Sequence, residues 1–299
     1  MIGVACCDRI ELPGHLGPYF ERLAPELDLR RPEEIDRPEE VSYMITFAPA
    51  PDAFVPYPNL RAVYSIGAGT DAILDCPSLP EGLPVYRVED PDQAIQMAGF
   101  AAFHVLWHHR NMGQYLENRK TGHWARSITG LSPQARRIGV MGFGHMGRAV
   151  ARGLVALGYP VAGYSRRMPT PVEPGVTHYT EDDLDAFLAQ SDILINVLPL
   201  TPTTQGLIDE EMLAKLPEGA ALIHLGRGGQ VDEAAMTAAL DRGQLSGASL
   251  DVFETEPLPP GHPLWTHPKV FVTPHVACIP EPQAVVLSIR EMLLQHLAA

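Results

Sequence analysis

The sequence predicts an α/β fold made of two Rossmann-like, doubly wound parallel-sheet domains. Three observations support this prediction. Short apolar runs alternate with helical patterns along the chain, glycine and proline separate them, and one strand–glycine–helix unit lies near the middle. At 299 residues the chain can hold one large or two ordinary domains with full cores.

The first part of the chain has the pattern of a smaller α/β domain. Strands are expected at residues 1–7, 41–47 and 60–65, a helix at 14–27, and proline-rich loops at 30–40 and 48–58. A long apolar helix is expected at residues 93–115, followed by a polar arm at 116–131 that contains Trp124.

The central unit consists of the strand Ile138–Met141, a helical pattern over residues 146–157 and a second strand at 160–164. Between the first strand and the helix lies a G-x-G-x-x-G pattern, whose glycines are Gly142, Gly144 and Gly147. Glycines at these places allow a tight turn, close approach of a pyrophosphate to the backbone, and close packing of helix on strand. The free N–H groups of the helix N-terminus favour phosphate. The unit therefore predicts dinucleotide binding.

The end of the second strand indicates which dinucleotide is bound. A fold that selects NAD usually places Asp or Glu about 20 residues beyond the glycines, where it holds the ribose hydroxyls. Here that place is occupied by Ser165, Arg166 and Arg167. A hydroxyl and two guanidinium groups attract a 2′-phosphate, so NADPH is predicted to be preferred over NADH. The alternative is that both arginines are solvated surface charges.

Strand–helix steps continue after the central unit. Helices are expected at residues 182–190, 210–216 and 233–242, and strands at 193–197, 221–225, 248–252 and 270–273. Ligands in such sheets bind beyond the carboxyl ends of the strands. Arg227, Glu256 and His275 each follow such an end, so we expect them to converge on one crevice.

These three residue types suit hydride-transfer chemistry. A nicotinamide carries a hydride but no proton, so a carbonyl reduction needs an acid and an alcohol oxidation needs a base. Histidine serves both directions, and a carboxylate beside it fixes the ring and favours its charged form. Arginine binds a carboxylate or polarises a carbonyl. The backbone N–H groups of Ala68 and Gly69 could close the site over a carboxylate.

Composition and charge narrow the function classes. The net charge of -14 argues against nucleic acid and anionic membranes as partners, and means that an anionic substrate needs local arginines. The four cysteines show no metal-ligand spacing, so no metal is expected and the thiols indicate a reducing compartment. The first residues lack a signal-peptide pattern and no apolar run reaches about 18 residues, so a cytoplasmic location is expected.

The chain resembles the D-2-hydroxyacid dehydrogenases, most of all the glyoxylate/hydroxypyruvate reductase A subgroup. The family stretches, in the family's order, are residues 65–71 (SIGAGTD), 142–147 (GFGHMG), 196–204 (NVLPLTPTT), 225–232 (LGRGGQVD), 250–257 (LDVFETEP) and 273–277 (TPHVA). The subgroup features are residues 66–69, Gln96 with Met97, residues 263–265, and the Ser-Arg-Arg sequence after the second strand of the central unit.

The resemblance implies NADPH-dependent reduction of small 2-oxo acids to D-2-hydroxy acids. It implies that Arg227 binds the substrate's carboxylate and carbonyl, that His275 is the acid/base, and that Glu256 is its partner. Asp251 would hold the nicotinamide carboxamide. The further cofactor contacts that we expect are His145, Met146, Leu198, Pro199 and Thr204.

The resemblance also implies the domain organisation. Residues 1–92 with 280–299 would form the substrate domain, and residues 93–279 the dinucleotide-binding domain. The cleft between them would close on the substrate. The arm at residues 116–131 would cross to a second subunit, which predicts a homodimer.

The chain departs from the subgroup at two places. Gly99 and Phe100 stand where Glu-Tyr is frequent, and Phe47 replaces a tryptophan of the substrate pocket. Both departures put the size of the substrate in question, so a dehydrogenase for a larger or different 2-oxo acid stays an alternative. A nucleotide-sensing corepressor with the same fold is another, although Arg227, Glu256 and His275 favour an enzyme. Glu256 also argues against a formate dehydrogenase, which has Gln there.

Overall fold

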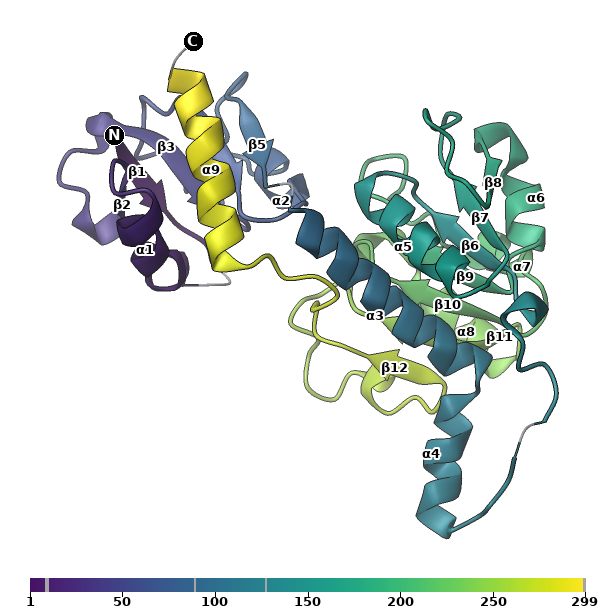
Figure 1. Ribbon diagram of the computed structural model, residues 1–299. Helices are drawn as coiled ribbons and strands as arrows, with labels where there is room; N and C mark the ends of the chain where they lie inside the picture. Colours follow the sequence, from purple (N-terminus) through teal and green to yellow (C-terminus); the bar gives the residue numbers. More distant parts are fainter. Residues whose placement is uncertain (9–10, 89, 127, 298–299) are drawn as a thin grey trace. The chain divides into compact units, whose positions relative to one another are not determined.

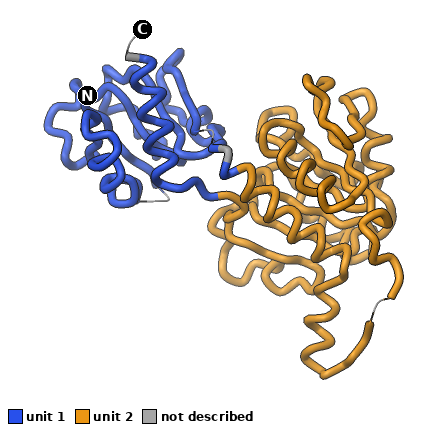
Figure 2. Tube along the Cα trace, viewed as in Figure 1, with its two compact units in different colours: residues 1–93, 279–299 blue, residues 94–278 orange. Residues whose placement is uncertain are grey.

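A computed structural model describes residues 1–8, 11–88, 90–126 and 128–297. The chain divides into two compact units, shown in Figure 2. The first unit consists of Met1–Gln93 and Ile279–Ala299, and the second of Ala94–Cys278. No helix in the described part of the chain is both long enough and apolar enough to cross a membrane.

The first unit is built on a five-stranded parallel sheet with the order β2-β1-β3-β4-β5. Its strands are β1 (Ile2–Ala5), β2 (Asp28–Arg30), β3 (Val41–Thr46), β4 (Ala62–Ser65) and β5 (Val85–Arg87). Its helices are α1 (Leu12–Leu23), α2 (Asp71–Leu74) and α9 (Pro282–Leu297). This strand order is that of flavodoxin-like sheets.

The last helix of the chain completes the core of the first unit. Helix α9 lies against α1 (Figure 1), and buried residues of both helices belong to one apolar cluster with the sheet. Leu12, Leu16 and Phe20 recur at helical spacing on α1 and are buried. Val286 and Ile289 of α9 are fully buried against them. The chain therefore leaves this unit after β5 and returns to it at residue 279.

The second unit is built on a seven-stranded parallel sheet with the order β12-β11-β10-β9-β6-β7-β8. Its strands are β6 (Ile138–Met141), β7 (Val161–Tyr164), β8 (Val176–Tyr179), β9 (Ile193–Asn196), β10 (Ala220–His224), β11 (Leu245–Leu250) and β12 (Val270–Val272). Its helices are α3 (Pro91–His109), α4 (Met112–Thr121), α5 (His145–Ala156), α6 (Leu184–Ala189), α7 (Glu210–Ala214) and α8 (Glu233–Asp241). The strand order reverses between β6 and β9, and ligands of doubly wound sheets bind at such a reversal.

The central strands are apolar, except for the last residues of β9 and β10, because both faces of the sheet are covered. Along β9, Ile193 and Ile195 belong to one apolar cluster, whereas Leu194 belongs to the cluster on the other face. Alternate residues of a strand point to opposite faces, so a strand buried on both sides has no polar face to show. The predicted α/β fold with two doubly wound parallel sheets is confirmed.

The expected helix at residues 93–115 is wrong as a single element. It divides at Asn111, which adopts a left-handed conformation (φ 50°), and α4 then extends into the segment expected to be an arm. Asparagine tolerates this conformation better than most residues, and nothing in the apolar pattern marks it. The first helix begins at Leu12 rather than residue 14, because Pro13 fits a first turn and the Glu11 carboxylate accepts a hydrogen bond from Gly14 N–H.

Candidate active site

The glycine-rich turn joins β6 to α5 in a conformation that needs glycine. Gly142 has a φ of +100°, and a Cβ atom there would lie 2.9 Å from the backbone nitrogen of Leu198. A Cβ atom on Gly147 would lie 1.8 Å from the carbonyl oxygen of Gly142. Gly144 and His145 are exposed where α5 begins. The turn therefore leaves the N-terminus of a 12-residue helix open to an anion.

The segment after β7 carries the residues predicted to bind a 2′-phosphate. The Ser165 hydroxyl donates a hydrogen bond to the carbonyl of Arg167 (2.7 Å), which curls the chain into a turn. Arg166 and Arg167 are exposed. Arg148 of α5 donates from Nη1 to the carbonyl of Pro171 (2.8 Å), so this segment is tied to the helix that begins at the glycine turn.

Glu256 and His275 form a hydrogen-bonded pair. Nδ1 of His275 donates to Oε2 of Glu256 at 2.9 Å, and the other carboxylate oxygen accepts from the backbone N–H of Phe253 at 3.1 Å. The Glu256 side chain is 16% exposed and that of His275 is 31% exposed. Because Nδ1 is bound to the carboxylate, Nε2 is the ring nitrogen that can exchange a proton with a substrate.

The backbone around His275 is held by Asp251. His275 has a φ of +54°, a left-handed conformation that is unusual for histidine, and its N–H donates to the Asp251 carbonyl at 2.8 Å. The Asp251 carboxylate is buried, and Oδ1 accepts from Thr273 Oγ1 (2.7 Å) and Val276 N–H (2.9 Å). Its Oδ2 accepts from Ala277 N–H (2.9 Å) and can still accept one more donor. The predicted contact of Asp251 with a carboxamide is compatible with this geometry, whereas its role in shaping the histidine loop was not expected.

The Arg227 turn packs directly on the segment that leads to Glu256. A Cβ atom on Gly228 would lie 1.9 Å from the carbonyl carbon and oxygen of Phe253. The half-buried Arg227 side chain donates from Nη1 to the carbonyl of Gly226 at 2.9 Å. The structure therefore places the turn of Arg227 against the segment carrying Glu256, which itself binds His275.

The loop after β9 contains Leu198, Pro199 and Thr204, the remaining predicted cofactor contacts. The Thr204 hydroxyl accepts from Thr201 N–H (2.8 Å) and donates to the Pro199 carbonyl (2.7 Å). It therefore sets the shape of the loop, and a direct contact with a cofactor stays a prediction. Gly142 lies against this loop, so the predicted cofactor contacts on β6 and β9 are neighbours at the strand-order reversal.

Phe47, Ala68 and Gly69 lie in the first unit, beyond the carboxyl ends of β3 and β4. The Ser65 hydroxyl donates to the Gly69 carbonyl at 2.7 Å, and a Cβ atom on Gly67 would lie 3.5 Å from the Phe47 ring. The three predicted substrate contacts of this unit are thus grouped around one turn. That they meet Arg227 and His275 stays a prediction.

Sequence reasoning missed three buried polar residues below the Arg227 turn, namely Asn196, His224 and Gln230. Each is at most 1% exposed. The signal that could have found the first two is their position, because each is the last residue of an otherwise apolar buried strand.

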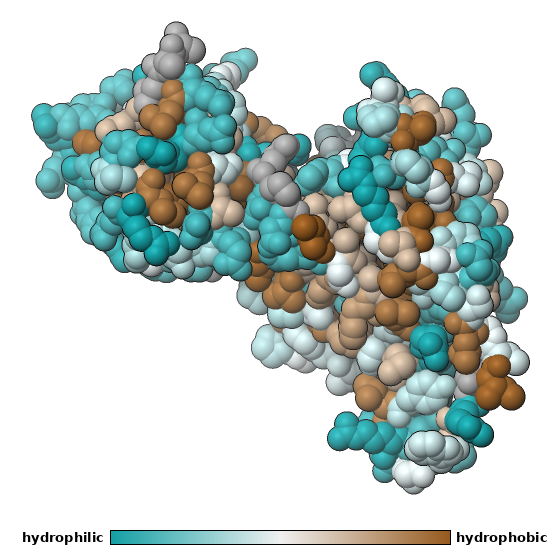
Figure 3. All heavy atoms as spheres, viewed as in Figure 1, coloured by the Kyte–Doolittle hydropathy of each residue, from teal (hydrophilic) through white to brown (hydrophobic). Residues whose placement is uncertain are grey.

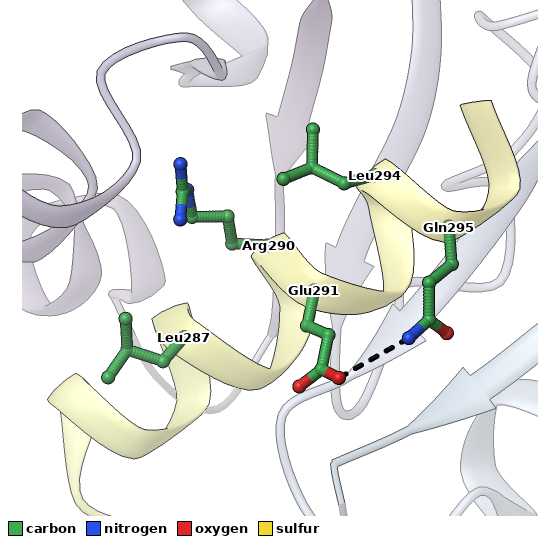
Figure 4. Close-up of a pocket in the computed structure, with 5 residues that line it drawn as sticks. All are labelled: Leu287, Arg290, Glu291, Leu294 and Gln295. Atoms are coloured by element: carbon green, nitrogen blue, oxygen red, sulfur yellow. Dashed lines mark hydrogen bonds between the residues drawn. The ribbon is translucent and has the colours of Figure 1, made fainter. Parts of the chain in front are cut away.

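Two surface pockets, one on each unit, are lined by residues other than the predicted catalytic ones. The pocket in Figure 4 lies on α9, where Gln295 donates to Glu291 (3.3 Å) and Arg290 points away from that pair. Arg290 forms an ion pair with Glu26, so its charge is compensated. Neither pocket is lined by a set of residues comparable to Arg227, Glu256 and His275 at the strand ends of the second unit. Within the described ranges, no cluster of three potential metal ligands occurs.

Comparison with known proteins identifies the family. The model of the D-isomer specific 2-hydroxyacid dehydrogenase NAD-binding domain matches residues 102–277, more than half of the chain. A D-isomer specific 2-hydroxyacid dehydrogenase from Xanthobacter autotrophicus, crystallised with NADPH, is 37% identical with a TM-score of 0.92; the match covers 99% of this chain and 95% of that one.

Two further crystal structures are similar over nearly the whole chain. An NADPH-dependent glyoxylate/hydroxypyruvate reductase from Sinorhizobium meliloti, in complex with NADP and sulfate, is 33% identical with a TM-score of 0.92, covering 99% of this chain and 95% of that one. A probable 2-hydroxyacid dehydrogenase from Rhizobium etli, in complex with NADP and tartaric acid, is 31% identical with a TM-score of 0.89, covering 99% and 94%. The chain therefore belongs to the D-isomer specific 2-hydroxyacid dehydrogenase family, whose members are oxidoreductases that bind a nicotinamide dinucleotide.

Proposed function

We propose that the protein reduces small 2-oxo acids, such as glyoxylate or hydroxypyruvate, to D-2-hydroxy acids with NADPH. The observation that carries this proposal is the His275–Glu256 pair, joined at 2.9 Å, with the turn of Arg227 packed against the same segment. An acid/base and a cation that binds carboxylates thus stand at neighbouring strand ends, on the sheet whose glycine turn suits a dinucleotide.

The residues of the chain have separate tasks in this proposal. The bound nicotinamide would supply the hydride. His275 would give a proton from Nε2 to the carbonyl oxygen of the substrate, while Glu256 stabilises the charged ring through Nδ1. The Arg227 guanidinium would bind the substrate carboxylate and stabilise the negative charge that grows on the carbonyl oxygen. In the oxidative direction, the neutral ring would take the proton back.

The cofactor preference is supported by the segment after β7. The glycine turn leaves the N-terminus of α5 open for a pyrophosphate, and Arg166 and Arg167 are exposed just beyond β7. Arginine binds phosphate through a planar pair of N–H donors, which a 2′-phosphate can accept. Similar structures contain NADPH or NADP, which agrees with this preference.

We propose that the first unit binds the outer part of the substrate through Phe47, Ala68 and Gly69, while the second unit binds the cofactor. The backbone N–H groups of Ala68 and Gly69 would bind the substrate carboxylate, and the Phe47 ring would limit the size of the substrate side chain that is accepted.

The four cysteines are all free, which supports the reducing compartment that a cytoplasmic location would provide.

We also propose that two copies of the chain form a symmetric dimer through α4 and the arm that follows it. Leu116 is 46% exposed, Trp124 is 89% exposed and Ile128 is 80% exposed. In the view of Figure 3, hydrophobic (brown) and hydrophilic (teal) residues are mixed over the visible face of the second unit. Large apolar side chains that are this exposed are typical of surfaces that a partner covers.

A substrate screen tests the proposed function. NADPH and NADH oxidation should be followed with glyoxylate, hydroxypyruvate, pyruvate and larger 2-oxo acids, and the chirality of the product determined. His275→Ala should lower the turnover number on the order of 10²–10⁴-fold, the usual contribution of a general acid. NADPH affinity should be unchanged in this variant. Failure of the unmodified protein to reduce any 2-oxo acid, or near-normal turnover of His275→Ala, would contradict the proposal.

A further inference from the structure

A buried polar network lies directly below the turn that carries Arg227. Its members are Asn196 and His224, the last residues of β9 and β10, and Gln230 in the turn Gly228–Gln230. Asn196 and His224 are partners in the parallel ladder, so their side chains project from the same face of the sheet. Strands β9 and β10 are adjacent in Figure 1. The network therefore sits at the carboxyl edge of the sheet, where the proposed site is formed.

Backbone partners determine how each side chain of this network is oriented. Leu198 N–H donates to the Asn196 Oδ1 atom at 3.2 Å, so Nδ2 of Asn196 must face Gln230 Oε1 (2.9 Å) and His224 Nδ1 (3.1 Å). Arg227 N–H donates to Gln230 Oε1 at 2.9 Å, which points Nε2 of Gln230 the other way. These amide orientations follow from the chemistry of the partners and not from a choice between nitrogen and oxygen.

The imidazole of His224 completes the network. The carbonyl of Arg227 can only accept, so Nε2 of His224 carries the hydrogen and donates to it at 2.9 Å. Nδ1 then accepts from Asn196. The ring must be neutral for this pattern, and complete burial lowers the pKa of His224 to about 4, which keeps it neutral near pH 7.

The same network reaches the loop after β9. The Gln230 side-chain nitrogen donates to the carbonyls of Leu198 (3.2 Å) and Pro199 (3.0 Å). Both backbone polar groups of Arg227 and three backbone polar groups of the predicted cofactor loop are therefore bound by the same three side chains. Gly226 also packs closely against this network, because a Cβ atom there would lie 2.3 Å from Gln230 Oε1.

We propose that Asn196, His224 and Gln230 are positioning residues that fix the Arg227 turn and connect it to the loop at residues 198–199. This inference rests on the proposed function, in which Arg227 binds the 2-oxo acid. His224 positions Arg227 through its carbonyl, so its loss should affect the substrate. Gln230 also holds the Leu198 and Pro199 carbonyls, so the loss of its donors should affect the dinucleotide.

Two substitutions of His224 distinguish the role of its Nε2 atom from that of its Nδ1 atom. The amide of His224→Gln can reach the place of Nε2 and keep a donor for the Arg227 carbonyl. The shorter amide of His224→Asn can replace only Nδ1, so the carbonyl loses its donor. We expect His224→Asn to raise the Michaelis constant and lower kcat/KM for the 2-oxo acid on the order of 10²-fold, as misplaced binding groups do. His224→Gln should restore most of this loss, and neither variant should change NADPH affinity.

Gln230→Glu tests the connection to the loop. The carboxylate can still accept from Asn196 and from Arg227 N–H, but it cannot donate to the Leu198 and Pro199 carbonyls. NADPH affinity, measured by calorimetry without any substrate, should fall in this variant. Unchanged NADPH affinity would overturn the proposed connection, whether or not the protein reduces 2-oxo acids.

Ser249→Ala is a matched control outside the network. Ser249 is buried on the neighbouring strand β11, and its hydroxyl contacts Nε2 of His108 at 2.8 Å. This variant also loses one buried hydrogen bond, so its stability should fall while its Michaelis constant and NADPH affinity stay unchanged. Equal Michaelis constants for His224→Asn and His224→Gln would overturn the positioning role. A Michaelis constant that rises as much in Ser249→Ala as in His224→Asn would also overturn it. Inactivity of the unmodified protein would instead contradict the proposed function.

Discussion

Replacing His104 by phenylalanine should stabilise the second unit, and more so in acid than at neutral pH. His104 is 1% exposed and its ring contacts those of Phe100, Phe103 and Phe271, with centroids 4.6–5.1 Å apart. Its Nδ1 atom has no hydrogen-bond partner among the described residues. Burial lowers the pKa of His104 from 6.5 to about 4, so the folded protein holds this ring neutral.

The magnitude follows from the two pKa values. Between pH 6.5 and 4 the unfolded chain binds a proton at His104 that the folded chain does not, so the free energy of unfolding falls as pH falls. At 1.36 kcal/mol for each unit of pKa, the full difference is roughly 3 kcal/mol, of which about 2 kcal/mol is lost between pH 7 and pH 5. The His104→Phe variant has no titrating group at this position, so it should not lose this stability when the pH falls. At pH 7 it should already gain about 1 kcal/mol, because a buried nitrogen without a partner is removed.

The measurement is urea unfolding followed by tryptophan fluorescence at pH 7 and pH 5. Trp107, Trp124 and Trp265 are the three tryptophans of the chain, and all belong to the second unit, so the signal reports that unit. His108→Phe serves as the comparison. Burial also lowers the pKa of His108 to about 4, but its Nε2 bonds to Ser249, so this variant should lose stability at pH 7. If His104→Phe raised the free energy of unfolding by the same amount at pH 7 and at pH 5, the reasoning would be refuted.

Three further predictions concern the cofactor, the assembly and the glycine turn. Arg166→Asp combined with Arg167→Ala should raise the Michaelis constant for NADPH and barely change that for NADH; equal use of both cofactors by the unmodified protein would contradict this. Light scattering at micromolar concentration should give the mass of a dimer, and Trp124→Glu should shift it toward the monomer, whereas a monomer mass for the unmodified protein would refute the assembly. Gly147→Ala should abolish NADPH binding, measured by calorimetry, because the new methyl group would overlap the Gly142 carbonyl at 1.8 Å. Retained affinity would show that the turn can open.

The sequence predicted the buried strands and the edge strand β12, but it missed three other edge strands. Strand β6 and its neighbours are continuous apolar runs because helices cover both faces of the sheet. Strands β2, β5 and β8 were not expected, and each lies at the edge of its sheet. An edge strand is bound on one side only, is short, and can be partly polar, as in Asp28–Arg30. Its pairing depends on a neighbour distant in sequence, which no local pattern shows.

The candidate site was predictable where a residue type has a specific chemical use. Arg227, Glu256 and His275 follow strand ends, and the structure joins the last two at 2.9 Å. The supporting residues were not predictable in the same way. Which backbone groups the Asp251 carboxylate binds depends on the left-handed turn at residue 275, and nothing in the spacing of the sequence fixes that conformation.

The residues that support the site are more informative about its geometry than about its stability. Four polar side chains at the carboxyl edge of the large sheet are each at most 1% exposed: Asn196, His224, Gln230 and Asp251. An intact buried hydrogen bond contributes only about 1 kcal/mol of net stability, although removing one of these side chains would leave a buried backbone group without its partner. Their hydrogen bonds go mostly to backbone groups of the loops that carry the predicted cofactor contacts, the arginine and the histidine. Such a bond fixes the position of a loop in a way that apolar packing cannot, because it specifies one donor and one acceptor. These four side chains therefore hold the three loops in fixed positions relative to one another.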